Sequence, residues 1–181
     1  MANKDNPRGF RPVTLIGGMT GVMPTWEGKM KSNQVAAYGD ALYASAGYIR
    51  GTATTDKAVR GVMAQKGYEK SGATGSTTTP ADILFYPAHD SVIFMGQTSG
   101  VGSQTDVWTF ADIEGTNGNS TGISNQEVDE DGTTNKNVWI IGLHKGGNNS
   151  AGTWRELEFV WAKTKFIPRG AMVLSTQYIG Y

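Results

Sequence analysis

The segment Glu156-Leu157-Glu158-Phe159-Val160-Trp161 places an apolar residue at every second position. A period of two is that of a β-strand, whose successive side chains point to opposite faces of a sheet. We expect this strand within the range 154–166, ended by the sequence that begins at Ile167-Pro168. No part of the chain shows a convincing 3.6-residue apolar period, although 105–113 is the best place for a short helix. The pattern predicts an all-β protein.

Further candidate strands lie on the N-terminal side of this segment. The ranges 82–87 and 91–96 are two apolar runs joined by the turn-like Ala88-His89-Asp90, and we interpret them as a β-hairpin buried on both faces. The other candidate strands are 13–16, 34–38, 41–44, 48–52, 58–65 and 138–143. The 25 glycines, with many Thr, Ser and Asn residues, favour short strands joined by turns over helices.

The 181 residues are expected to form one small β-barrel or β-sandwich body with two extensions. The predicted organisation is an extended arm and irregular segment at 1–33, the body at 34–166, and an apolar C-terminal tail at 167–181. The expected core residues come from the candidate strands: Ile83, Phe85, Val92, Phe94, Val107, Phe110, Trp139, Ile141, Leu157, Phe159 and Trp161.

The first thirteen residues have the composition of an extended arm that binds a partner. Pro7 and Pro12 keep their preceding residues out of helix, and Phe10 lies between Arg8 and Arg11. An aromatic side chain flanked by charges is typical of a binding anchor, so these five residues are the candidate arm site. A mobile leader without a partner is the alternative. The candidate subunit contacts are Met19, Met23, Trp26, Tyr178, Ile179 and Tyr181.

Charge and cysteine content argue against several classes of protein. Sixteen basic and sixteen acidic residues cancel, whereas nucleic-acid-binding proteins normally show a basic excess. The absence of cysteine excludes disulfides, thiolate metal sites and cysteine nucleophiles. No apolar run has the length of a bilayer span, and the N-terminus does not have the pattern of a signal peptide. We therefore expect synthesis in a cytosol and no membrane partner.

A search for reactive constellations predicts neither catalysis nor a cofactor. The only histidines, His89 and His144, stand at strand ends with no third metal ligand at a telling spacing. The acidic run 127–132 is not an EF-hand, because the twelfth loop position falls on Val138; a looser calcium or magnesium site is the alternative to a solvated turn. The glycine-rich ranges 96–102 and 115–122 lack a phosphate-loop motif and are interpreted as turns.

The five tryptophans fall into two groups. Trp108, Trp139 and Trp161 lie in candidate strands and are most simply core residues. Trp26 and Trp154 lie in or beside loops, where an indole lines either a ligand groove or a subunit contact. A carbohydrate-binding platform is the specific alternative for these two residues.

The segment from Asn6 to Val13, Asn-Pro-Arg-Gly-Phe-Arg-Pro-Val, resembles the opening of a family of capsid decoration, or cement, proteins of tailed bacteriophages. Later segments are similar to that family in the same order. They are Gly-Asp-Ala-Leu at 39–42, Gly-Val-Met-Ala at 61–64, the strand at 107–113 with the turn at 122–125, and the final two strands at 140–143 and 157–160. The range 19–33 and the tail after Pro168 depart from the family pattern.

The resemblance implies a non-enzymatic structural protein of the virion, made in the host cytoplasm and seated on the outer capsid surface where capsomers meet. Its partners would be the major capsid protein and itself, as a homotrimer. The arm would order along the shell, paying an entropic cost that many symmetric copies offset. Two other classes stay open: a head-fibre or receptor- or glycan-binding module that uses Trp26, Trp154 or Tyr181, and a small β-barrel enzyme.

Overall fold

The computed structural model describes residues 8–16, 23–32, 34–51, 58–65, 68–69, 81–116, 124–146, 149 and 152–162. The arm residue Pro7 and the contact candidates Met19, Tyr178, Ile179 and Tyr181 lie outside these ranges. The described residues form strands and one 3-10 helix of three residues, which confirms the predicted all-β class. They include no helix with the length and apolar character needed to cross a membrane.

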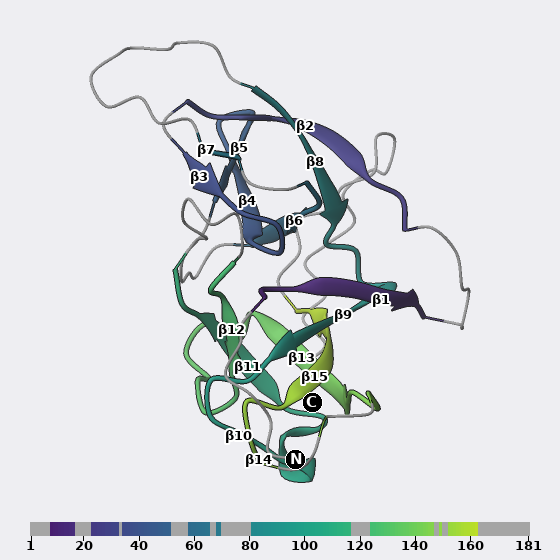
Figure 1. Ribbon diagram of the computed structural model, residues 1–181. Coiled ribbons are helices and arrows are strands. Elements are labelled where there is room, and N and C mark those ends of the chain that lie inside the picture. The colour runs from purple at the N-terminus through teal and green to yellow at the C-terminus, as the bar shows by residue number, and fades with distance from the viewer. Residues whose placement is uncertain are drawn as a thin grey trace.

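The upper part of the molecule in Figure 1 is a closed five-stranded barrel with the strand order β2-β5-β4-β6-β8. β2 and β5 pair in parallel, and the other neighbours are antiparallel. The strands are β2 (Trp26–Met30), β4 (Ala41–Ser45), β5 (Tyr48–Gly51), β6 (Val59–Met63) and β8 (Ala81–Pro87). A short pair, β3 (Val35–Ala36) with β7 (Tyr68–Glu69), accompanies the barrel.

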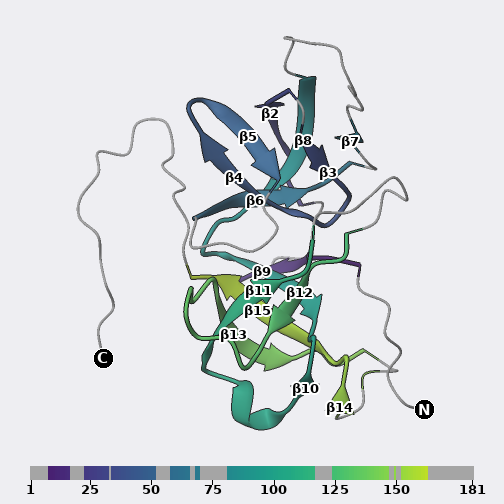
Figure 2. The same ribbon diagram turned by 90° about the vertical axis from the view of Figure 1, so that its left-hand side faces the viewer.

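The lower part is a six-stranded antiparallel sheet with the order β1-β9-β15-β13-β11-β12. Its strands are β1 (Arg11–Leu15), β9 (Val92–Gln97), β11 (Phe110–Glu114), β12 (Glu127–Asp129), β13 (Val138–Leu143) and β15 (Glu156–Trp161). The pair β10 (Val101–Gly102) with β14 (Gly152–Thr153) and the 3-10 helix η1 (Gln104–Asp106) lie at the end away from the barrel, as Figures 1 and 2 both show.

The barrel is inserted in the chain between two neighbouring strands of the sheet. β1 and β9 pair with each other, yet β2 to β8 separate them in sequence. The predicted hairpin of 82–87 with 91–96 is therefore wrong, because β8 pairs with β2 and β6 whereas β9 pairs with β1 and β15. The link that follows Pro87 takes the chain from barrel to sheet. Apolar runs indicate burial, but they do not identify the pairing partner.

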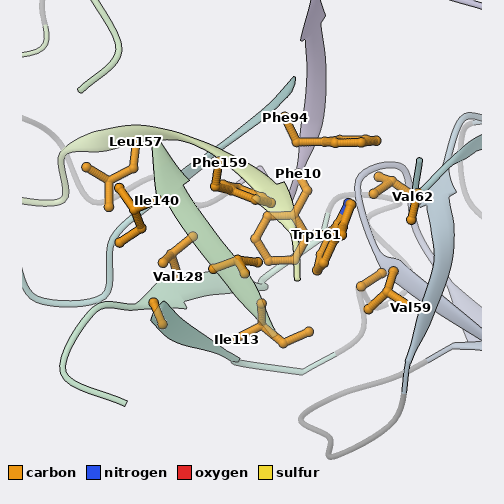
Figure 3. Packing of buried hydrophobic residues seen from close by; sticks show 14 of the residues in the cluster. Phe10, Val59, Val62, Phe94, Ile113, Val128, Ile140, Leu157, Phe159 and Trp161 are labelled. Carbon is orange, nitrogen blue, oxygen red and sulfur yellow. The ribbon is translucent and has the colours of Figure 1, made fainter. Parts of the chain in front are cut away.

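Two apolar clusters hold the parts together. The barrel interior contains Met30, Ala36, Leu42, Ile49, Met63, Ile83 and Phe85. A larger cluster, here called the junction core, lies between the sheet and the outer face of the barrel; it includes Ala41, Val59 and Val62 from the barrel with Phe94, Leu157, Phe159 and Trp161 from the sheet. Figure 3 shows the two valines facing the sheet aromatics. The barrel thus has its own interior cluster and shares the junction core with the sheet.

The expected core list is confirmed for seven of its residues and wrong for four. Ile83, Phe85, Val92, Phe94, Leu157, Phe159 and Trp161 are buried. Val107, Trp139 and Ile141 are only half-buried, and Phe110 is exposed. In β13 the inward residues are Val138 and Ile140, and in β11 they are Ala111 and Ile113. A run that is apolar at nearly every position does not indicate which alternate residues face inward. The expected inward residues of β11 and β13 are therefore shifted by one position.

Candidate functional site

Phe10, the expected arm anchor, is a core residue. Its side chain is fully buried and makes edge-to-face contacts with Phe159 and Trp161, at centroid distances of 5.6 and 5.3 Å. Figure 3 shows the ring between these two side chains. The Phe10 N–H donates to the Gly39 carbonyl at 2.8 Å. An anchor for a partner needs an accessible ring, so the interpretation of Phe10 as a capsid-binding residue is wrong.

The boundary between arm and body also needs correction. Arg11 and Pro12 begin β1, which pairs along β9, and β2 belongs to the barrel. The body therefore starts before residue 34. Arg11 forms an ion pair with Glu156 at 2.5 Å, partly exposed to solvent, so its charge already has a partner within the sheet. Of the described arm residues, Arg8 has an exposed side chain.

Gly9 allows the chain before β1 to pack closely against the rest of the body. Its φ of +65° is the left-handed region that favours glycine, and an added Cβ would lie 2.5 Å from the Gly39 carbonyl oxygen, inside van der Waals distance. The same Cβ would also clash with Ser124. Gly9 thus fits into a tight contact between the two segments that contain Gly39 and Ser124.

Buried polar groups complete this contact between barrel and sheet. The Gln126 side-chain oxygen accepts from the Ala41 N–H at 2.7 Å, and the Ser124 hydroxyl oxygen accepts from the Gln126 N–H at 3.1 Å. The Asp40 carboxylate accepts from the Ala37 N–H at 2.6 Å and fixes the turn before β4. Buried polar groups that are satisfied in this way specify one arrangement of the segments they join.

The segments on which the expected family resemblance rests meet at this junction. The Phe10 N–H bonds to Gly39, and the Gly39 N–H donates to the Met63 carbonyl at 3.0 Å. The turn residue Ser124 packs on Gly9, and Phe159 packs on Phe10. Motifs separated by as much as 150 positions in the sequence are therefore neighbours in space. Figures 1 and 2 both place β1 between the barrel and the rest of the sheet.

The described candidates for subunit contact have different environments. Met23 is partly buried and packs against the junction core of its own chain. Trp26 is 44% exposed at the start of β2, opposite Phe85. Trp154, the other tryptophan expected beside a loop, is half-buried and has a positive φ of 58°.

Sequence reasoning missed an exposed aromatic group at the entrance to β11. Trp108 was expected in the core but is 65% exposed. Residues 106–109 form a turn closed by a hydrogen bond from the Thr109 N–H to the Asp106 carbonyl at 3.2 Å. Val107 has φ −67° and ψ 133°, and Trp108 has φ +71°. These angles describe a type II turn with tryptophan at the position that favours glycine.

The same tryptophan is the first residue of a β-bulge. The Trp108 N–H donates to the Ile140 carbonyl at 2.8 Å, and the Ile140 N–H donates to the Thr109 carbonyl at 3.0 Å. Trp108 and Thr109 thus lie opposite the single residue Ile140. In the G1 type of bulge, the first of the two residues is a glycine with a left-handed backbone conformation. Two residues later, the Phe110 ring packs edge-on against Trp139 at 4.5 Å, with the Lys136 ammonium 5.5 Å from its centroid. The sequence signal for this exposed aromatic group was the run Val107-Trp-Thr-Phe110. Its apolar residues were interpreted as core residues of a strand.

The two histidines lie apart and contact different carboxylates. His89 Nδ1 lies 2.6 Å from the Ser91 hydroxyl and 2.8 Å from the Asp90 carboxylate. Both contacts use one ring nitrogen, whereas a Ser-His-Asp triad needs serine and carboxylate on opposite nitrogens. His144 Nδ1 lies 2.8 Å from Glu158 on the sheet. This geometry is not that of a triad.

The acidic segment folds as a hydrogen-bonded turn. The Asp129 carboxylate accepts from the Gly132 N–H at 3.0 Å, and Asp112 accepts from the Lys136 N–H at 2.6 Å. Burial raises the pKa of Asp129, and the neighbouring Glu114 carboxylate adds to the increase. Burial likewise raises the pKa of Glu130, which is 7% exposed beside Gly100. Across the described residues no three metal-binding side chains come together, so the looser calcium or magnesium site gains no support there.

Comparisons with known proteins give no relative: no family model, no curated protein and no solved structure matches the chain.

Proposed function

We propose that this protein is a non-enzymatic decoration protein of a tailed-bacteriophage head, bound to the major capsid protein on the outer surface of the shell. The observation that supports the proposal most is the convergence of the family-like segments on one junction. Chance similarities scattered along a chain have no reason to become neighbours, whereas residues that define a fold do. The Gly9–Gly39 contact and the Phe10–Phe159 packing are such neighbours.

The physical character of the body suits a clamp on a shell under internal pressure. Barrel and sheet pack together through the junction core, so a force applied at one part is transmitted to the other through packed side chains. The formal charge of zero avoids attraction to the packaged DNA. We propose a homotrimer, because closed rings of like subunits bury surface that one small body leaves exposed.

The first test is co-sedimentation of the purified protein with undecorated shells, followed by thermal disruption of the decorated shells. We expect saturable binding and a higher disruption temperature. Arg8→Ala is expected to weaken binding in a salt-dependent way, because Arg8 is an exposed residue within the family-like N-terminal motif. Lys29→Ala, an exposed basic residue on the barrel, is the matched control and is expected to bind normally.

Two results would contradict the proposal. Absence of shell binding at micromolar protein would remove the decoration function, and a monomer in light scattering at the same concentration would remove the trimer. Equal loss of binding in the Arg8 and Lys29 variants would mean that general charge, rather than the N-terminal motif, attaches the protein.

A further inference from the structure

Trp108 occupies a backbone position that penalises it. A left-handed φ is natural for glycine, but it brings the Cβ of any other residue close to its own backbone, and for a bulky side chain it is a genuine outlier. Both the type II turn and the G1 bulge favour glycine at this position. The turn and the bulge would therefore form more readily with glycine at this position, and strained residues of this kind cluster at functional sites.

The strained backbone presents the indole to solvent. Exposure of 65% is the largest among the exposed apolar residues of the described chain. Exposed apolar surface on a soluble protein is a cost that binding sites tolerate. The position is also well defined, because three backbone hydrogen bonds of 2.8, 3.0 and 3.2 Å tie residues 106–109 to each other and to Ile140. Trp108 is thus a pre-organised aromatic surface.

The accessible surface at this position is that of one side chain. A tryptophan buries at most about 250 Å², so at an exposure of 65% Trp108 leaves on the order of 160 Å² accessible. One sugar ring can stack on an aromatic surface of this extent.

The surroundings fit a sugar better than an apolar peptide. Gln104, Thr105 and Thr109 are exposed polar residues in or next to the same turn. The Thr109 hydroxyl donates to the Asp106 carbonyl at 2.6 Å, which leaves the hydroxyl oxygen available as an acceptor. The exposed hydroxyl and amide groups that flank Trp108 in the sequence complement a pyranose, whose ring has a C–H face and an edge of hydroxyl groups.

We propose that Trp108 is the stacking platform of a saccharide-binding site, and that its ligand is a hexopyranose unit of a polysaccharide. This activity goes beyond shell decoration and is independent of it, because it belongs to the isolated protein. Phe110, 37% exposed and packed on Trp139, provides a second aromatic surface for a neighbouring sugar unit.

The test uses the full chain with cellohexaose, chitohexaose, maltohexaose and an array of bacterial surface polysaccharides as probes. Calorimetry measures affinity, and saturation-transfer NMR identifies the bound ring. The decisive variant is Trp108→Gly, which removes the indole and relieves the backbone. We expect its melting temperature to equal or exceed that of the parent, while affinity for the bound saccharide falls about tenfold or more. Trp108→Asn, whose side chain tolerates left-handed φ, is expected to behave in the same way.

Trp26→Ala is the control, because it removes an exposed indole from the barrel. We expect it to bind saccharide as the parent does. Failure of the parent to bind any probe would overturn the proposal, and so would full affinity in Trp108→Gly. If Trp108→Gly bound no less saccharide but lost shell binding or self-association, Trp108 would be a protein-contact residue, and the saccharide proposal would fail while the decoration function stood.

Discussion

Replacing Phe10 by alanine should destabilise the whole body. Phe10 is fully buried between Phe159 and Trp161, and large-to-small changes of this kind cost about 3–5 kcal/mol. Domains are stable by only about 5–15 kcal/mol, so the loss is a large share of the total. For a chain of this length, roughly 2–4 °C per kcal/mol gives a fall in melting temperature of about 6–20 °C.

The assay is thermal and urea unfolding followed by circular dichroism and tryptophan fluorescence. Ile16→Ala is the matched control: it lies just after β1, it is also a large apolar residue, and it is 57% exposed. We expect its stability to remain within about 0.5 kcal/mol of the parent. A melting temperature for Phe10→Ala within about 2 °C of the parent would refute the placement of Phe10 in the junction core. Deletion of residues 1–12 removes Phe10 and part of β1, so we expect it to abolish the native fold.

Three further outcomes follow from the same structure. Gly96→Ala places a Cβ 2.7 Å from the Phe10 ring and is expected to cost about 1–3 kcal/mol in urea unfolding; an unchanged midpoint would contradict this packing. Gly9→Ala adds a positive φ and a backbone clash and should destabilise more than Gly96→Ala, so the reverse order would count against the Gly9 contact. Burial raises the folded-state pKa of Glu130 above its ordinary value of 4.5, so its contribution to stability is present below that pH and declines as the pH rises. The Glu130→Gln variant should therefore exceed the parent in unfolding free energy by more at pH 7 than at pH 4. A difference that does not change with pH would disprove the raised pKa of Glu130.

The sequence was sufficient for the fold class and for the strands with a clear period. β15 has an apolar residue at every second position and glutamates at two of the three positions between, so both its existence and its inward residues Leu157, Phe159 and Trp161 were predicted correctly. The run 138–143 is apolar at nearly every position, and it predicted the strand β13 but not the face that Trp139 occupies. Periodicity defines a face only where polar residues mark the other face.

Long-range pairing and the candidate site were harder to predict. β1 has only two apolar residues besides its proline, so nothing local distinguishes it from an arm. Its burial depends on β9, some eighty residues later. For the same reason Phe10 resembled a surface anchor. Trp108 was missed because a left-handed tryptophan contradicts the residue preference of its turn. Preferences predict the usual residue, and functional positions are where a protein departs from them.

The insertion of the barrel between β1 and β9 has a consequence for how the protein is made. Strands β2 to β8 are contiguous in sequence, so the barrel has all its pairing partners while the ribosome is still translating the remainder. At ordinary elongation rates of about 5–20 residues per second, β1 must wait about 4–16 s for β9, and Phe10 must wait about 8–30 s for Trp161. We expect arrested nascent chains that end before β15 to contain a protease-resistant barrel and a protease-sensitive β1. Protection of β1 should appear only once β15 has left the exit tunnel.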